Sequence, residues 1–110
     1  MAAAETLPLR LLLCACPDTG TAEDIAAALV EARLAACVTL LPGARSVYRW
    51  QGQVRRAEEC VMLIKTRAAD YPALEQRLLQ LHPDQVPELL ALPILGGNPA
   101  YLAWLGTAGD

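Results

Sequence analysis

Apolar and polar positions follow two different periods along this chain, and the changes of period mark the expected elements. Over residues 7–16 the apolar positions are nearly continuous, which predicts a strand buried on both faces. Over residues 22–35 they recur at helical spacing, which predicts a helix. Between the two, residues 17–21 (PDTGT) predict a turn that ends on Thr21, whose hydroxyl suits a helix N-cap.

The middle of the chain has the pattern of a long hairpin. Residues 37–41 and 46–50 predict one strand with a bend or bulge at Pro42-Gly43. Gln51-Gly52 predicts the hairpin turn, and residues 54–66 predict a long third strand. Because these arms are longer than one small sheet requires, we expect the hairpin to contact another subunit.

The last third returns to helical spacing before a final strand. Apolar residues recur through residues 70–82, and Pro83 predicts the end of that helix at His82. Residues 86–95 predict a fourth strand whose prolines suit an edge of the sheet. Asn98-Pro99 then predicts the start of a short helix over residues 100–105.

The expected elements occur in the order strand, helix, strand, strand, helix and strand, followed by a short helix. A βαββαβ order is typical of the ferredoxin-like sandwich, which is an α+β fold. No internal repeat, linker or low-complexity stretch interrupts the sequence. We therefore expect residues 1–110 to form a single domain.

The composition predicts self-association. Hydrophobic residues make up 55% of the chain and charged residues 19%. An average soluble domain has roughly 45–50% and about 25%. A small domain has too much surface for its volume to bury this apolar excess alone, so we expect a homo-oligomer.

Charge and hydropathy argue against two classes of partner. The net charge is −3, and Arg55-Arg56 is the only adjacent pair of basic residues, which argues against nucleic acid and anionic membranes. No apolar run approaches the roughly 18–20 residues that a membrane span needs. We therefore expect neither a nucleic-acid nor a membrane partner.

The N-terminal segment and the cysteines bear on localisation. The apolar stretch over residues 11–16 is shorter than the ~7–15 residues of a signal-peptide core, and Glu5 lies where a basic residue would be needed. We therefore expect a first strand rather than a leader. All four cysteines lie in apolar, strand-like segments, as reduced core cysteines do; they are Cys14, Cys16, Cys37 and Cys60. Free thiols predict a cytoplasmic protein.

Catalytic motifs are weakly represented. Neither the PDTGT turn nor Gly96-Gly97 has the pattern of a phosphate-binding loop. The one serine, Ser46, lacks the surroundings of a nucleophile elbow. The cysteines lie in apolar strands, where burial raises a thiol pKa and opposes nucleophilic catalysis. We therefore do not expect an enzyme.

Metal binding is the chemistry that the residue types allow. Cys14 lies near the end of the first strand, and His82, the only histidine, ends the second helix. Thiolate and imidazole together suit copper or zinc, although no C-x-x-C or H-x-x-H spacing is present. The simpler interpretation makes Cys14 a packed core side chain and His82 a helix C-terminal residue near the last carbonyls. Sequence alone leaves both interpretations open.

A second candidate site combines aromatic and charged side chains. Its members are Tyr48, Trp50, Glu59, Lys65, Tyr101 and Trp104. Lys65 ends an apolar strand, where its ammonium would need a carboxylate such as Glu59 or Glu88. The group would form either a small-ligand pocket between subunits or an ordinary interface with aromatic anchors.

Several motifs together resemble the CutA family of divalent-cation tolerance proteins. They are C-x-x-P-D from Cys14, LAACV before the second strand, PG followed by S-x-Y-x-W, IKT at residues 64–66, HP and PE at residues 82–83 and 87–88, and YLAWL at residues 101–105. They occur in order over about residues 9–106. The resemblance implies a ferredoxin-like subunit in a homotrimer that responds to metal ions, with Cys14 and His82 as candidate ligands for copper and other divalent cations.

The resemblance also keeps other functions open. A trimer of this kind could be a PII-like small-ligand sensor, or a structural trimer that tethers other proteins. Two positions depart from the family pattern, because Asp84 replaces the tyrosine that commonly follows HP and Leu81 replaces a histidine found before HP in some members. One imidazole per subunit then remains, and the Asp84 carboxylate could add an oxygen ligand.

Overall fold

The computed structural model describes residues 8–110, in which strands and helices follow the expected order. The elements are β1 (Leu9–Cys16), α1 (Thr19–Glu31), β2 (Cys37–Trp50), β3 (Gln53–Arg67), a 3-10 turn (Ala68–Asp70), α2 (Tyr71–Leu81), β4 (Leu89–Pro93) and α3 (Pro99–Gly106). Leu7, which we expected in the first strand, lies outside the described residues. None of the helices in residues 8–110 is long and apolar enough to cross a bilayer.

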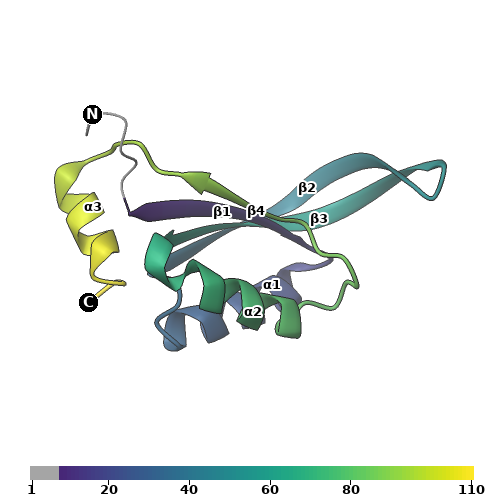
Figure 1. Cartoon of the computed structure of the whole chain (residues 1–110). Coiled ribbons are helices and arrows are strands. Elements are labelled where there is room, and N and C mark those ends of the chain that lie inside the picture. The colour runs from purple at the N-terminus through teal and green to yellow at the C-terminus, as the bar shows by residue number, and fades with distance from the viewer. Residues whose placement is uncertain (1–7) are drawn as a thin grey trace.

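The four strands form one antiparallel sheet in the order β2-β3-β1-β4, which confirms the mixed α+β class. Both α1 and α2 lie on the same side of this sheet, and α3 lies near one end of it (Figure 1). The hairpin of β2 and β3 extends beyond the sheet at the opposite end (Figure 1). The βαββαβ order and this strand order place the ends of β1 and α2 close to the base of the hairpin.

The core lies between the sheet and the two helices. Along β1, Leu12, Cys14 and Cys16 point to the same side, because alternate residues of a strand share a face. All three are fully buried, and they pack with Ile25 and Leu29 of α1. Leu74 and Leu78 of α2 complete this cluster. Each helix therefore buries its apolar stripe against this face of the sheet.

The opposite side of the sheet is apolar as well, but α1 and α2 do not cover it. We call this side the open face; its leucines are Leu11, Leu13, Leu41, Leu63, Leu90 and Leu92. The strand register places them together, because Leu13 pairs with both Leu63 and Leu90 and Leu11 pairs with Leu92. Leu41, Leu90 and Leu92 are exposed. A continuous apolar patch of this kind marks a binding surface in most soluble proteins.

Helix α1 starts and ends earlier than the sequence pattern predicts. The N-cap is Asp18 rather than Thr21, because an Asp18 carboxylate oxygen accepts the backbone N–H of Thr21 at 2.7 Å. The Thr21 hydroxyl donates to the other Asp18 oxygen at 3.1 Å. The helix ends at Glu31 because Arg33 turns the chain with a φ of 59°.

The hairpin and the final strand also refine the prediction. The bulge predicted at Pro42-Gly43 is confirmed; β2 continues through it, and Gly43 there has a φ of 78°. Gln51 and Gly52 both have positive φ, as a tight hairpin turn requires. β4 is an edge strand as expected, but it spans only Leu89–Pro93. The residues before it, 83–88, form a loop instead.

Candidate functional site

Three ligand-type side chains meet where β1 ends and α2 is followed by its loop. They are Cys14, Cys16 and His82, whose ligand atoms all lie within 4.8 Å of one another. Cys14 and Cys16 are fully buried and His82 is 7% exposed. The strand spacing places both thiols on the helix side of the sheet, and the end of α2 brings the imidazole over them. The fold therefore unites the two predicted metal ligands, Cys14 and His82, and adds Cys16.

Both ring nitrogens of His82 have hydrogen-bond partners. Nε2 lies 2.7 Å from the Ala15 carbonyl oxygen, which can only accept, so Nε2 carries a hydrogen. Nδ1 accepts the backbone N–H of Asp84 at 3.0 Å. These two bonds select the neutral Nε2–H tautomer, and they tie the end of α2 to β1 and to the following loop.

The backbone of His82 ends α2, as the helical pattern predicts, but its side chain makes a contact that the pattern does not predict. Its backbone N–H donates to the Leu78 carbonyl at 2.9 Å, so His82 is the C-cap of α2. The imidazole turns away from the last helical carbonyls and bonds to Ala15 of β1 instead. His82 therefore both ends the helix and lies beside the two thiols.

The two neighbouring thiols differ in acidity. Interaction with Cys16, followed by burial, raises the pKa of Cys14 far above its ordinary value. Interaction with Cys14 lowers the pKa of Cys16. The Cys14 thiol itself donates to the Ala15 carbonyl oxygen at 4.0 Å. A thiolate beside a neutral imidazole is a donor set for soft metal ions.

Cys16 is the member of this cluster that sequence reasoning did not treat as a ligand. Its spacing from Cys14 shows that both share one strand face. That spacing was a usable signal, but C-x-C within an apolar run is equally typical of core packing. Asp84 does not join the cluster; its carboxylate lines a cavity outside it.

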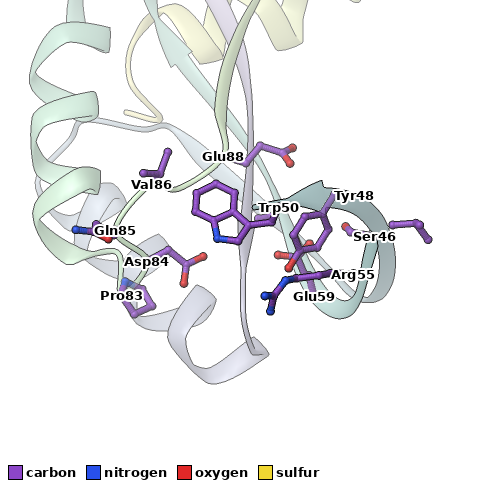
Figure 2. Close-up of a pocket in the computed structure, with 12 residues that line it drawn as sticks. Ser46, Tyr48, Trp50, Arg55, Glu59, Pro83, Asp84, Gln85, Val86 and Glu88 are labelled. Atoms are coloured by element: carbon purple, nitrogen blue, oxygen red, sulfur yellow. The ribbon is translucent and has the colours of Figure 1, made fainter. Parts of the chain in front are cut away.

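The predicted aromatic and charged site divides into two places in the fold. Tyr48, Trp50 and Glu59 lie together in a cavity of about 780 Å³ between the hairpin and loop 83–88. Figure 2 shows the indole of Trp50 between the loop carrying Asp84 and the Tyr48 side of the hairpin. Lys65, Tyr101 and Trp104 do not line this cavity.

Lys65, Tyr101 and Trp104 belong to other parts of the sheet and to α3. The ammonium of Lys65 donates to the Thr39 hydroxyl at 2.6 Å, and its second polar neighbour is the sulfur of Cys37 at 3.8 Å. The expected carboxylate partner, Glu59 or Glu88, is therefore wrong, since neutral groups on β2 already solvate the ammonium. The rings of Tyr101 and Trp104 contact each other within α3, with centroids 5.6 Å apart.

Comparison with known proteins identifies the family. The model of the CutA1 divalent ion tolerance protein family matches residues 10–108. The divalent-cation tolerance protein CutA of Thermus thermophilus is 50% identical over 96 residues, which cover 87% of this chain and 93% of that protein.

Solved structures agree with this match. The crystal structure of CutA from Xylella fastidiosa has a TM-score of 0.89 and 47% identity, and the match covers 94% of this chain and 99% of that one. A protein described as the periplasmic divalent cation tolerance protein CutA of Archaeoglobus fulgidus has a TM-score of 0.87 at 29% identity, with coverage of 93% and 99%. This chain therefore belongs to the CutA family of divalent-cation tolerance proteins.

Proposed function

We propose that this protein binds copper, as copper(I), at Cys14, Cys16 and His82, and that it contributes in this way to the response to metal ions. The observation that carries the proposal is the convergence of two buried thiols and one buried imidazole within 4.8 Å. Sulfur and imidazole donors select copper(I) and zinc over magnesium and calcium. Three donors suit copper(I) better than structural zinc, which is almost always held by four protein ligands.

Binding would exchange hydrogen bonds that the metal-free protein already makes. One His82 nitrogen must release the Ala15 carbonyl or the Asp84 N–H before it can face a metal ion. The proton on Cys14 must also leave, because the thiolate is the ligand. Without metal, both ring nitrogens of His82 already have hydrogen-bond partners, so the site does not depend on a metal ion for its stability.

We propose that the protein assembles as a homotrimer through the open face and the hairpin. The open face is a contiguous set of leucines that α1 and α2 leave uncovered, and the hairpin carries the exposed side chains of Val47, Trp50 and Val54. Burial of apolar surface stabilises association by roughly 25 cal/mol per Å². The choice of three subunits per assembly rests on the family resemblance.

We propose a cytoplasmic location, supported by the four free cysteines of the described residues. Cys14 and Cys16 bind copper(I) only in the reduced state, which a reducing compartment maintains.

A second function, a small-ligand sensor, is favoured by the cavity between the hairpin and loop 83–88. Three residues of the predicted aromatic and charged site line it: Tyr48, Trp50 and Glu59. A cavity of this size accommodates a small organic molecule.

Copper(I) competition with a chromogenic chelator tests the metal proposal on the reduced full-length protein. We expect one tightly held copper(I) per chain, and a loss of affinity of at least about tenfold in Cys14→Ser and in Cys16→Ser. Cys37→Ser is the matched control, because that half-buried thiol bonds with Lys65 and lies outside the cluster. Circular dichroism of each variant verifies that it is folded.

The proposal fails if wild type removes no copper(I) from the chelator, or if Cys37→Ser loses as much affinity as the two cluster variants. A parallel zinc(II) titration decides the metal. Tighter zinc than copper(I) binding would replace copper in the proposal.

A further inference from the structure

Two of the four thiols face each other across neighbouring strands. Cys16, the last residue of β1, is directly opposite Cys60 of β3 in the antiparallel register. Both are fully buried and belong to the core between the sheet and the helices α1 and α2. They therefore lie on the face that the helices cover, and not on the open face or the outer hairpin, through which we propose that subunits associate.

The register brings this pair within the reach of a disulfide. The backbone N–H of Ala68 donates to the Pro8 carbonyl at 2.9 Å, and these two residues continue the register of β1 and β3. Hydrogen-bonded pairs alternate with non-hydrogen-bonded pairs along an antiparallel ladder. An even number of steps from Pro8, Cys16 and Cys60 form a hydrogen-bonded pair, with Cα atoms about 5.5 Å apart. Disulfides most often join Cα atoms about 5.5–6 Å apart.

Each of the two cysteines lies where its strand is paired on one side, which allows them to approach. Cβ atoms of opposite residues are about 4.5–5.5 Å apart, and a disulfide needs about 3.5–4.5 Å, so the pair must close by roughly 1 Å. The pairing of β1 with β4 ends at Cys14, so within residues 8–110 Cys16 is paired with β3 alone. The pairing of β3 with β2 skips Cys60, because the bulge at Pro42-Gly43 interrupts the ladder there.

The other thiols are less well placed for this bond. Cys14 and Cys16 are two residues apart on one strand, so their Cα atoms are about 6.6–6.8 Å apart, at the upper limit of disulfide geometry. Across the sheet, a methionine is opposite Cys14 and a lysine is opposite Cys37. In the part of the chain that the structure describes, Cys16 and Cys60 are thus the one pair of cysteines that the sheet places opposite each other.

We propose that Cys16 and Cys60 form a reversible disulfide when the protein is exposed to a peroxide, and that this bond removes Cys16 from the copper site. First, the sulfur of one thiol takes an oxygen from hydrogen peroxide as the O–O bond breaks, which gives a sulfenic acid and one water. The second thiol then attacks that sulfur; the S–O bond breaks, the S–S bond forms and a second water leaves. Two electrons pass from the thiols to the peroxide, and both thiol protons end in water.

The disulfide would act on the metal site through a shared ligand. Cys16 belongs both to the cross-strand pair and to the cluster with Cys14 and His82, whereas Cys60 lies outside that cluster. A sulfur in a disulfide is no longer a thiolate, and the thiolate is the metal ligand. Oxidation would leave two donors and release copper(I); this part of the inference rests on the proposed function. Because both thiols are buried, a small peroxide reaches them more easily than a bulky disulfide does.

Peptide mapping tests the bond without reference to copper. The reduced, chelator-treated protein is exposed to hydrogen peroxide, its remaining thiols are alkylated in denaturant, and it is digested with trypsin. Trypsin releases Cys14 and Cys16 together in residues 11–33, Cys37 in residues 34–45 and Cys60 in residues 57–65. We expect peptides 11–33 and 57–65 of one chain to be joined, and fragmentation to place the bond at Cys16. Dithiothreitol should separate the two peptides.

Alanine variants verify the assignment. We expect the cross-link to be absent from Cys16→Ala and from Cys60→Ala, and to form as in wild type in Cys37→Ala, the matched control. The melting temperature of each reduced variant verifies that it is folded. The peptide map of wild type identifies the bonded residues even if one variant does not fold.

Copper(I) competition on the oxidised sample tests the coupling to the metal site. We expect oxidised wild type to lose at least about tenfold in affinity, and reduction followed by removal of the reductant to restore it. Reduced Cys60→Ala should bind copper(I) as wild type does, because Cys60 is not among the clustered ligands.

Three results would overturn the inference. The first is a peptide map in which peroxide produces no disulfide. The second is a different pairing, such as a loop closed within residues 11–33 or a bond between two chains. The third is a Cys16–Cys60 cross-link that leaves copper(I) affinity unchanged. A protein that forms this cross-link but binds no copper(I) even when reduced would support the disulfide and contradict the proposed copper site instead.

Discussion

At the scale of the residue, His82 combines a structural role with the ligand role that we propose for it. It closes α2 through its backbone, and its ring joins the Ala15 carbonyl to the Asp84 N–H. The only other ligand-type side chains gathered with it in residues 8–110 are the thiols of Cys14 and Cys16. The metal that we propose would therefore compete with hydrogen bonds that hold the helix end in place.

We predict that His82→Ala destabilises the metal-free protein by about 1–3 kcal/mol, because it leaves the buried Ala15 carbonyl and the partly buried Asp84 N–H without their partner. Urea unfolding of the reduced, chelator-treated protein measures this. Gln76→Ala, at an exposed position of α2, is the control and should change the unfolding midpoint little. Equal midpoints for His82→Ala and wild type would show that the two ring hydrogen bonds do not stabilise the fold.

Residue chemistry also explains what the sequence could and could not reveal about the site. Cys14 and His82 were identifiable as ligand types, and their meeting required the fold. Cys16 was visible as a partner on the same strand face, but spacing alone does not separate two ligands from two packed thiols. The carboxylate partner expected for Lys65 was wrong because its ammonium donates to the Thr39 hydroxyl on the neighbouring strand.

At the scale of the element, helix α1 depends on its first turn for a titratable interaction. The backbone N–H of Thr21, and then its hydroxyl, lower the pKa of Asp18 by hydrogen bonding to the carboxylate. A carboxyl whose pKa is lower in the folded state stabilises the fold above its unfolded pKa of about 3.9. That contribution is lost as the pH falls through the still lower folded pKa.

We therefore predict that Asp18→Ala lowers the melting temperature at about pH 7, and that the difference from wild type is smaller at about pH 3, below the unfolded pKa, where part of the charge-dependent contribution is lost. Asp18→Asn keeps an N-cap oxygen without the charge, so its difference from wild type should be smaller than that of Asp18→Ala at neutral pH. Thermal unfolding followed by circular dichroism at the two pH values checks both. A difference between Asp18→Ala and wild type that stays constant with pH would exclude the charged cap.

The elements themselves were largely predictable, and their ends were not. The spacing of apolar residues and the positions of proline and glycine predicted all four strands and three helices. Burial determines the first of these signals, and backbone geometry determines the second. The start of α1 was placed too late because Asp18 and Thr21 are both good caps, and only their mutual hydrogen bonds decide between them. The late start of β4 at Leu89 could not be foreseen, because the preceding loop begins at His82, whose ring bonds to β1 and to the Asp84 N–H.

At the scale of the whole molecule, the sheet is covered on one face and open on the other. The helices use their apolar stripes on the Cys14 side, so the leucines of the open face have no cover within residues 8–110 other than the short α3 near one end (Figure 1). This arrangement gives a physical reason for the apolar excess that the composition shows.

We predict that Leu41→Glu converts the assembled protein from a trimer to a monomer, because it places a charge on the face that we propose is buried between subunits. Leu79→Glu is a matched control, since Leu79 of α2 is 48% exposed and Leu41 is 47% exposed. Light scattering after size exclusion should show three chain masses for wild type and Leu79→Glu, and one for Leu41→Glu. A trimer that survives Leu41→Glu unchanged would move the interface away from this face.

X-ray absorption at the copper edge, on the reduced full-length protein loaded with one copper(I) per chain, tests the central claim most directly. Scattering from the first shell distinguishes sulfur from nitrogen and oxygen and counts them. The account predicts two sulfur neighbours and one imidazole nitrogen, with one sulfur lost in Cys16→Ser. A shell of nitrogen and oxygen only, or one unchanged by Cys16→Ser, would contradict a site made of Cys14, Cys16 and His82.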